Sequence, residues 1–409
     1  MNILQINERD VTGGAAWAAY RLHRDLNRRG HRSRMLVNRK LTSDLTVRPL
    51  VRNRAWDRAD RAAGALLDRA GAQYAFYPST FGIVRDPWFR DADVVQLHNT
   101  HGGYFTLTAL PVLSRVRPIV WTLHDQWPMT GHIIYARDCE RWRTGCGACP
   151  YLSEYAPLPL DTTAALWRFK RAVYWASRLE LVSPSRWLAG LAGASPLLRR
   201  FRIHHIPYGV DLDTFSPGAQ TEARSRLELP LDRRIVLFIS ELAEERKGFH
   251  LLAGALETIA PSPLLLLMTS GARDVGVEAR AVPASDDERR VADAYKAADL
   301  VVVPSLADNF PNVVLEAMAC GTPCVAFDTG GIGEAVRAGR TGFLVAPTDV
   351  RGLTNVVKAV LEDAALRRRL GHEARRVASA EYGLALQSER YLALYQAVRR
   401  SGRGAAELS

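Results

Sequence analysis

Short apolar segments of strand length alternate with longer amphipathic segments along almost the whole chain. This alternation indicates β-α-β units, in which helices join parallel strands. The strands expected in the first half are 3–6, 35–37, 94–98, 119–124, 179–183 and 203–207; those in the second half are 235–240, 264–269, 300–304, 324–328 and 343–345. Two such series in 409 residues predict an α/β protein with two Rossmann-like, doubly wound domains.

The boundary between the two series is expected at 208–217, a segment rich in Pro, Gly and Asp that follows an apolar strand. We therefore expect an N-terminal domain over 1–207, a linker over 208–217 and a C-terminal domain over 218–385. The tail, 403–409, is expected to be disordered.

Composition excludes a disordered chain or a small disulfide scaffold, because 47% of the residues are hydrophobic and 24% are charged. No apolar run approaches the length of a membrane-spanning helix, and the N-terminus lacks the features of a signal peptide. We expect a cytoplasmic, soluble protein whose five cysteines are reduced.

The net charge of +11 lies in the first half of the chain, where residues 1–215 hold 30 Lys and Arg against 18 Asp and Glu. An excess on one side favours an acidic partner, such as nucleic acid, an anionic membrane surface or a phosphorylated substrate. A basic surface that only keeps the protein soluble is the alternative.

Two glycines, Gly13 and Gly14, follow the first expected strand and open a helix expected over 15–29. Glycines at such a turn let backbone N–H groups approach an anion at the helix N-terminus. A purely structural turn is the alternative.

A basic pair, Arg246-Lys247, precedes Gly248 between the strand expected at 235–240 and the next helix. Open α/β sheets bind ligands outside the carboxyl ends of their strands, so this pair would suit a diphosphate. Arginine would form a fork and lysine a point charge. A solvated loop is the alternative.

The most informative motif follows the strand expected at 300–304. A polar loop with Asp308 and Asn309 leads into a helix expected from about Asn312, with Asn312 or Asn309 as its cap. Backbone N–H groups of its first turn would face an anion. Glu316, one turn further on, could accept hydrogen bonds from sugar hydroxyls, and Asp308 could hold a second polyol. The motif predicts a site for a nucleotide diphosphate and a sugar; a capping residue and a surface Glu are the alternative.

Asp308 and Glu316 are separated by seven residues, which resembles the E-x7-E signature of glycosyltransferase family 4 with Asp in place of the first Glu. The resemblance covers residues 1 to about 398 and includes, in order, Gly13-Gly14, Gly30-His31, His124-Asp125, Tyr208-Gly209-Val210-Asp211, Arg246-Lys247-Gly248 and Gly330-Gly331. It implies a GT-B fold, in which two Rossmann-like domains face each other across a cleft. The first domain would take the acceptor and the second the nucleotide sugar, and a helix at about 386–402 would return to the first domain.

The resemblance also implies roles for the matched residues. Glu316 would bind the ribose of the donor, and Asp308 would hold hydroxyls of the transferred sugar. Arg246 and Lys247 would neutralise the diphosphate leaving group, and His124 would lie near the transferred sugar.

Further residues complete the expected donor site. Gly13 and Gly14 would approach the diphosphate from the first domain. Asn312 and Val313 would supply phosphate-binding N–H groups, because Pro311 has none. The remaining residues expected at the donor are Asn309 and Phe310.

The expected activity is transfer of a hexose from a nucleotide-diphosphate sugar to an acceptor hydroxyl, in the assembly of a surface polysaccharide or glycoconjugate. The resemblance implies retention of anomeric configuration. A catalytic metal is not required, because cationic side chains and helix N–H groups stabilise the leaving diphosphate. The acceptor is expected to be a glycan, a lipid-linked glycan or a small molecule, and nucleic acid is not an expected partner.

Three other functions stay open. The acceptor could be a soluble natural-product aglycone. The chain could instead be a nucleotide-sugar epimerase with a GT-B fold, or a donor-binding protein without activity.

Four possible metal ligands, His132, Cys139, Cys146 and Cys149, follow the pattern H-x6-C-x6-C-x2-C. The Cys-Gly-Ala-Cys segment has the spacing of a zinc knuckle, and a reducing compartment favours metal over a disulfide. Structural zinc, unligated thiols and a disulfide all stay open. The other two cysteines, at 320 and 324, are expected in the core.

Two further histidines, His98 and His101, lie in a Gly-rich segment after an expected strand. Contacts with the acceptor or the sugar are one hypothesis. An ordinary loop or helix-capping role is the alternative.

A basic stretch contains Arg48, Arg52, Arg54, Arg58, Arg61 and Arg69. At helical spacing Arg54, Arg58 and Arg61 share one face, and Ala55, Ala62, Leu66 and Ala70 are expected to pack inwards. With the aromatic residues that follow over 74–89, this segment could be a flap that docks at the inner membrane face or on a lipid-linked glycan. A solvated helix beside an aromatic core is the alternative.

Overall fold

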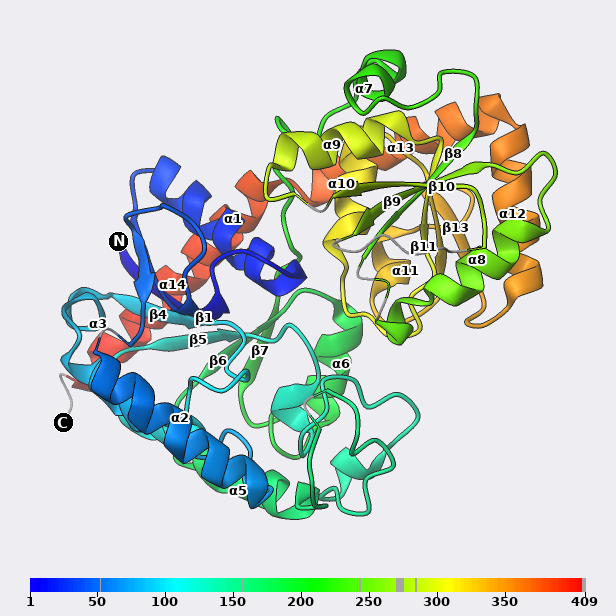
Figure 1. Cartoon of the computed structure of the whole chain (residues 1–409). Helices are drawn as coiled ribbons and strands as arrows, with labels where there is room; N and C mark the ends of the chain where they lie inside the picture. The colour runs from blue at the N-terminus through cyan, green and yellow to red at the C-terminus, as the bar shows by residue number, and fades with distance from the viewer. Residues whose placement is uncertain are drawn as a thin grey trace. The chain divides into compact units, whose positions relative to one another are not determined.

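The computed structural model describes residues 1–51, 53–155, 157–240, 242, 244–269, 276–283 and 285–406, with side chains as far as Ser401. The chain divides into two compact units (Figure 1). Unit 1 comprises Met1–Pro207 and Gln387–Ser409, and unit 2 comprises Tyr208–Leu386. The segment expected as a linker, 208–217, therefore belongs to unit 2.

Unit 1 is built on a seven-stranded parallel sheet with the order β3-β2-β1-β4-β5-β6-β7. The strands are β1 (Asn2–Arg9), β2 (Arg32–Arg39), β3 (Val47–Pro49), β4 (Val94–Leu97), β5 (Ile119–Thr122), β6 (Glu180–Ser183) and β7 (Arg202–His205). The helices are α1 (Gly14–Arg28), α2 (Arg54–Arg69), α3 (Pro87–Asp91), α4 (Leu110–Val116), α5 (Thr163–Trp175), α6 (Arg186–Ala194) and the greater part of α14 (Leu384–Ala406).

Unit 2 is built on a six-stranded parallel sheet with the order β10-β9-β8-β11-β12-β13. The strands are β8 (Ile235–Ile239), β9 (Leu264–Thr269), β10 (Ala279–Pro283), β11 (Leu300–Val303), β12 (Cys324–Phe327) and β13 (Gly342–Val345). The helices are α7 (Gln220–Arg226), α8 (Phe249–Glu257), α9 (Glu288–Ala297), α10 (Asn312–Cys320), α11 (Ile332–Ala335), α12 (Val350–Glu362) and α13 (Ala364–Glu381).

Both sheets reverse their strand order once. In unit 1 the chain moves outward from β1 through β2 to β3 and then returns to place β4 on the other side of β1; in unit 2 the reversal lies between β8 and β11. Ligands of open α/β sheets bind outside the carboxyl ends of the strands at such a reversal. The predicted doubly wound α/β architecture is confirmed. In each unit, the topology predicts a ligand site at the carboxyl edge of the sheet, beside the strand reversal.

Apolar side chains cover both faces of the unit 1 sheet, as expected for parallel strands joined by helices. On one face Ile3, Val94 and Val120 pack against α1 and α14, which lie beside each other (Figure 1). On the other face Leu4, Val95 and Trp121 belong to a larger core. Burial of each such side chain is worth roughly 1.5–3 kcal/mol, so α14 contributes to the stability of unit 1.

Two sequence expectations differ from the structure. Helix α14 extends to Ala406, into the segment expected to be disordered, and residues 407–409 lie outside the described residues. Helix α2 exposes Ala55, Ala62, Leu66 and Ala70, which were expected to pack inwards. The buried residues of α2 are instead Asp60, which accepts a hydrogen bond from the Ser79 N–H (3.1 Å), and Gly64, whose backbone packs against Tyr77. Arg52 of the basic stretch lies outside the described residues.

Within the described part of the chain, no helix is both long and apolar enough to cross a bilayer. The two cysteines expected in the core, Cys320 and Cys324, are buried.

The turn that follows β8 depends on Gly248. Its φ is +67°, and a Cβ added there would lie 1.9 Å from the carbonyl oxygen of Pro304, at the end of β11. We expect Gly248→Ala to lower the melting temperature by several degrees, because left-handed backbone and a clash with rigid backbone act together. Gly254→Ala, in α8 where an added Cβ meets nothing within 4 Å, is the matched control and should be neutral or stabilising. Equal thermal melts for the two variants would contradict this account of the turn.

Candidate active site

Two loops meet at the strand reversal of unit 2. One follows β8 and contains the short 3-10 helix Glu245–Lys247; the other follows β11 and contains Asp308. Nζ of Lys247 lies 2.7 Å from Oδ2 of Asp308, and the N–H of Leu306 donates to the carbonyl of Arg246 (2.7 Å). Residues predicted to bind a diphosphate and a sugar therefore touch each other at the place where the topology predicts a ligand.

Asp308 is buried, but its pKa lies below the usual value. Burial alone would raise the pKa of this carboxyl, and the charges of Lys247 and Arg246 outweigh that effect. Oδ1 also accepts a hydrogen bond from the N–H of Asn309 (3.0 Å). Asp308 is thus an ionised acceptor at neutral pH, which suits it to bind sugar hydroxyls.

Arg246 is held by different partners. Its guanidinium lies 2.7 Å from Oε2 of Glu244 and 4.0 Å from Oδ2 of Asp308, and it donates to the carbonyl of Ala307 (3.3 Å). Its side chain is 26% exposed and that of Lys247 is 20% exposed, so both cations can be reached from solvent. Both cations already pair with carboxylates. A bound anion would therefore compete with Glu244 and Asp308 for Arg246 and Lys247.

Helix α10 begins at Asn312, and its N-cap is Pro311. The sequence prediction that Asn312 or Asn309 caps this helix is therefore wrong: proline fixes the extended backbone before the first turn, and Asn309 lies too far back in the loop. Asn312 and Val313 are half-buried and supply the first N–H groups of the helix. An anion at this end would meet the positive end of the helix dipole.

Glu316 is buried one turn into α10. Its Oε2 accepts a hydrogen bond of 2.7 Å from the hydroxyl of Tyr295, in α9. Tyr295 was missed by the sequence reasoning, because a tyrosine in an amphipathic helix carries no signal that distinguishes it from a core residue. Its hydroxyl fixes the orientation of the carboxylate that is expected to bind ribose.

The loop before α10 is held by hydrogen bonds from the segment that follows β12. The N–H of Gly331 donates to the carbonyl of Asn309 (2.8 Å), and the hydroxyl of Thr329 donates to the carbonyl of Ser305 (2.7 Å). Phe310 is buried between the rings of Tyr208 and Tyr382. Asn309 and Phe310 therefore act as supports of the loop, and their predicted contact with a donor remains a prediction.

The strand reversal of unit 1 carries the glycine pair. Gly13 is the N-cap of α1 with φ of +85°, and a Cβ added to it would meet nothing within 4 Å. The preceding turn is held by the buried carboxylate of Asp10, which accepts from the N–H groups of Val11, Leu41 and Thr42. Asp10 was also missed, because it could not be distinguished from a solvated turn residue.

Four histidine and aspartate side chains lie at the same edge of unit 1. Nε2 of His124 lies 3.0 Å from Nδ1 of His98, and Nε2 of His101 lies 2.9 Å from Oδ2 of Asp125. All four are buried. Burial lowers the pKa of His124 to about 4 and that of His98 well below its usual value, so both are neutral at pH 7. His98 and His101 are therefore buried and paired, and their predicted contact with a substrate remains a prediction.

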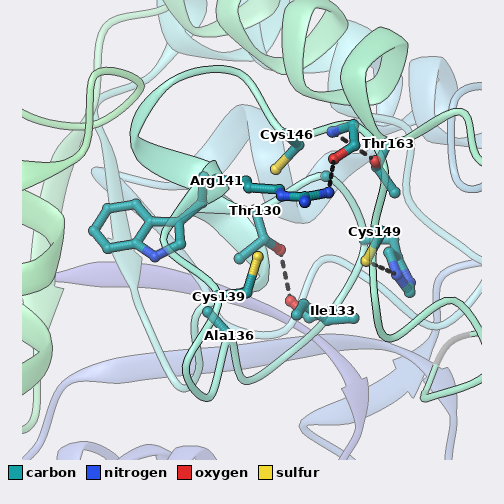
Figure 2. Close-up of a pocket in the computed structure, with 12 residues that line it drawn as sticks. Thr130, Ile133, Ala136, Cys139, Arg141, Cys146, Cys149 and Thr163 are labelled. Carbon is teal, nitrogen blue, oxygen red and sulfur yellow. Dashed lines mark hydrogen bonds between the residues drawn. The ribbon is translucent and has the colours of Figure 1, made fainter.

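The cysteine segment lines a separate pocket in unit 1 (Figure 2). Sγ of Cys149 lies 3.4 Å from Nε2 of His132, and Arg141 extends across the pocket to the carbonyls of residues 147 and 148. Burial raises the pKa of the Cys146 thiol to about 11 and also raises that of Cys149.

Throughout the described ranges, no three His, Cys, Asp or Glu side chains are arranged to hold a metal ion. The four predicted ligands His132, Cys139, Cys146 and Cys149 line one pocket but do not fit a zinc ion as they stand. Structural zinc therefore stays a prediction from the sequence.

Comparison with known families gives two matches along the chain. The family described as Glycosyltransferase Family 4 matches residues 12–214. The family described as Glycosyl transferases group 1 matches residues 233–363. Together they account for parts of both units.

Among curated relatives, D-inositol 3-phosphate glycosyltransferase 1 of Catenulispora acidiphila is 32% identical over 349 residues, which cover 80% of this chain and 76% of the relative. D-inositol 3-phosphate glycosyltransferase of Xylanimonas cellulosilytica is 38% identical over 203 residues, which cover 44% of this chain and 48% of the relative. The similarity to the second relative spans about half of the length of that relative.

Two solved structures show the same fold at low identity. Anabaena HepE in complex with UDP-glucose has a TM-score of 0.68 at 17% identity and covers 97% of this chain and 99% of its own. Sucrose-phosphate synthase of Thermosynechococcus elongatus has a TM-score of 0.67 at 19% identity and covers 98% of this chain and 100% of its own.

The zinc prediction is tested by elemental analysis of the purified protein. Structural zinc requires about one zinc per chain, released by a chelator together with a loss of stability. Cys149→Ser should then abolish zinc binding, and Cys320→Ser, a buried cysteine outside the pocket, should leave it intact. If the purified protein contains no metal and the thiols of Cys139, Cys146 and Cys149 all titrate, both structural zinc and a disulfide are contradicted.

Proposed function

The chain belongs to glycosyltransferase family 4, and from this premise we propose that its donor, a nucleotide-diphosphate sugar, binds at the strand reversal of unit 2. The chain is a glycosyltransferase of GT-B fold that uses a nucleotide-sugar donor. The observation that carries the proposed site is the contact between Lys247 and Asp308 beside the N-terminus of α10.

Each part of the donor has a group of matching chemistry at this edge. Ionised Asp308 accepts hydrogen bonds from the hydroxyls of the transferred sugar. Lys247, Arg246 and the first N–H groups of α10 bind the diphosphate. The carboxylate of Glu316, oriented by Tyr295, accepts from the ribose. A UDP-hexose is the first donor to test, supported by the complex of HepE with UDP-glucose.

The proposed reaction depends on charge that appears during bond breaking. Cleavage of the sugar–phosphate bond builds negative charge on the diphosphate and positive character on the sugar. Lys247 can leave Asp308 for the phosphate as that charge grows, and the freed carboxylate then faces the positive sugar. We infer retention of configuration, with the leaving phosphate taking the acceptor proton, and no catalytic metal is needed for this step.

The acceptor is proposed to carry an anionic group. Residues 1–215 hold 30 basic against 18 acidic residues, and the relatives named above act on an inositol phosphate. A polyol phosphate and a lipid-diphosphate-linked glycan share this chemistry. Transfer to a polyol phosphate in solution would favour the first source, and transfer only to the lipid-linked glycan would favour the second.

The donor site is tested by steady-state kinetics with Lys247→Ala and Glu316→Ala. We expect Lys247→Ala to lower kcat on the order of 10²-fold, more than it changes donor affinity, because its charge acts on the leaving group. We expect Glu316→Ala to lose most donor binding, since a hydrogen bond to a charged group is worth roughly 1.5–3 kcal/mol.

Controls for these variants lie on the surface of unit 2. Lys358→Ala, at an exposed pair with Glu362 in α12, and Glu373→Ala, beside Arg376 in α13, should behave like the wild type. Unchanged donor binding in a folded Glu316→Ala protein, or a Lys247→Ala variant with only a higher KM, would contradict the proposed site.

Nucleotide release separates transfer from the other proposed activities. A transferase releases the nucleotide diphosphate in proportion to glycosylated acceptor. An epimerase acts on the donor alone, and a non-catalytic protein binds the donor without releasing the nucleotide.

We also propose that α2 docks peripherally on an anionic membrane. Its exposed side carries Trp56 (52% exposed) and Leu66 (68% exposed) together with exposed alanines. Arg54, Arg58 and Arg61 are exposed on the same helix. An apolar stripe flanked by arginines suits lipid headgroups and the acyl boundary beneath them.

Vesicle co-sedimentation tests this docking. Binding should require anionic lipid, weaken with salt and be lost when Arg54, Arg58 and Arg61 are changed to Glu, since each arginine adds about 1 kcal/mol near such a surface. The matched control changes three exposed arginines of unit 2, Arg289, Arg290 and Arg351, to Glu. Equal partitioning with neutral and anionic vesicles would remove the proposal and favour a soluble acceptor.

A further inference from the structure

A cavity of about 540 Å³ lies in unit 2, lined by residues of α7, of α9 and of the turn 211–216. Helix α7 packs against α9 (Figure 1). The lining residues are all polar or charged: Asp213, Thr214, Arg226, Arg289, Asp293 and Lys296. The residues predicted to bind the donor, in the loops after β8 and β11, are not among them. The volume of the cavity is that of an ordinary small-molecule site.

Helix α7 is fixed to the end of α9 by polar contacts. Nε of Arg224 donates to the carbonyl of Ala297 (3.0 Å), and its guanidinium pairs with the buried carboxylate of Asp299 (2.8 Å). The side-chain amide of Gln220 donates to the carbonyl of Ala298 (3.1 Å). These contacts hold two walls of the cavity together without a ligand.

The third wall is a turn that is held from within and from α13. The carboxylate of Asp211 accepts from the N–H of Asp213 (3.1 Å) and from the hydroxyl of Thr214 (3.3 Å). The guanidinium of Arg375, in α13, donates to the carbonyl of Phe215 (2.9 Å). Protein contacts thus position the turn, while the carboxylate of Asp213 itself forms no hydrogen bond or ion pair with the part of the chain that the structure describes.

Helix α9 contributes a row of charged side chains. Arg289, Asp293 and Lys296 follow one another at helical spacing, so they lie along one side of the helix. Asp293 is already paired, because its two carboxylate oxygens accept from the guanidinium of Arg226 at 2.8 and 2.9 Å. Within the described ranges, the side chains of Arg289 and Lys296 form no hydrogen bond or ion pair.

Lys296 is half-buried, and its aliphatic stem lies beside the backbone of Gly218. A Cβ added to that glycine would lie 3.3 Å from Cδ of Lys296. Lysine stems commonly lie along the protein surface and keep the ammonium group in water. The protein therefore holds the stem of Lys296 at the wall of the cavity and leaves the ammonium group to attract an anion.

The charges of the cavity select a class of ligand. Once Arg226 and Asp293 have neutralised each other, two cations and one carboxylate remain. A phosphate group would pair with Arg289 and Lys296. The ionised carboxylate of Asp213 only accepts hydrogen bonds, which suits it to hydroxyl groups. An inorganic anion would leave Asp213 unused, and a neutral sugar would leave both cations unused.

We propose that this cavity binds a phosphorylated sugar or polyol. The phosphate lies against Arg289 and Lys296. The hydroxyl groups lie against Asp213 and Thr214, whose own hydroxyl can donate or accept. The site goes beyond the proposed function, because it is lined by other residues than the donor site and takes part in no step of the transfer.

Helix α9 also joins the cavity to the proposed donor site. Tyr295, next to Lys296 in α9, donates its hydroxyl hydrogen to Glu316 (2.7 Å). A ligand on Lys296 would thus contact the helix that orients the carboxylate expected to bind ribose. The cavity lies in unit 2 alone, so its ligand can be measured whether or not a donor binds at Glu316.

The test is isothermal titration calorimetry of the full chain in a buffer free of phosphate and sulfate, with glucose 6-phosphate and inorganic phosphate as probes. We expect glucose 6-phosphate to bind in the absence of UDP and also in saturating UDP, which fills the proposed donor site. Arg289→Gln combined with Lys296→Gln should raise the Kd for glucose 6-phosphate about tenfold or more, because each change removes a hydrogen bond to a charged group.

Asp213→Asn separates recognition of the hydroxyl groups from recognition of the phosphate. The Kd for glucose 6-phosphate should rise several-fold, because an amide oxygen is a weaker acceptor than a carboxylate. Inorganic phosphate should bind as well as before or more tightly, because a negative charge has been removed. Equal weakening for both probes would contradict the placement of the hydroxyl groups at Asp213.

Matched controls keep the test specific. Arg290→Gln changes an exposed arginine next to Arg289 that does not line the cavity, and it should bind glucose 6-phosphate like the wild type. Lys247→Ala, in the proposed donor site, should also leave this binding intact. Circular dichroism shows whether each variant is folded.

Three results would overturn the proposal: a wild type that does not bind glucose 6-phosphate at millimolar concentration, unchanged binding in the folded double variant, or displacement of glucose 6-phosphate by UDP. The second result would show that the phosphate binds elsewhere on the chain. A protein that binds glucose 6-phosphate as expected but does not bind UDP would contradict the proposed function and leave this site intact.

Discussion

The contact between Lys247 and Asp308 depends on the reversal of strand order in unit 2. These residues are 61 positions apart and meet only because β11 returns to pair with β8. The same return places the start of α10 at this edge, and Gly248 allows the two loops to approach closely. The pair joins a buried carboxylate to a cation that solvent can reach, so it holds one cation near a phosphate site and one carboxylate near a sugar site.

Unit 1 follows the same topological rule with different chemistry. Its strand reversal carries Gly13 at the open N-terminus of α1, and neutral, buried histidines replace the charged groups of unit 2. The buried rings of His98 and His124 are costly to bury, and they are tolerated because they are hydrogen-bonded to each other and to Gln5.

Much of this could be predicted from the sequence. The alternation of strand and helix patterns predicted the doubly wound fold, and the resemblance carried by the Asp308–Glu316 motif and the other matched motifs indicated the family. The order of the strands, by contrast, depends on long-range pairing that no local pattern encodes. Asp10 and Tyr295 went unrecognised, because their partners come from distant segments and the residues look ordinary in isolation.

Helix α2 shows what amphipathic periodicity cannot predict. The positions of Ala55 and Leu66 fit an inward face, but the helix is attached through Asp60 and Gly64 on its opposite side. Amphipathic spacing identified the stripe correctly and could not tell which side faces the protein. The cysteine segment is similar: its spacing brings the thiols to one pocket, and zinc there remains a prediction.

The most direct test of the account is a crystal structure of the chain with UDP or a UDP-sugar bound. We expect the diphosphate to lie against the first turn of α10 and Lys247, with the ribose hydroxyls on Glu316. A nucleotide bound elsewhere, with the pair between Lys247 and Asp308 unchanged and Glu316 still bonded only to protein groups, would contradict it.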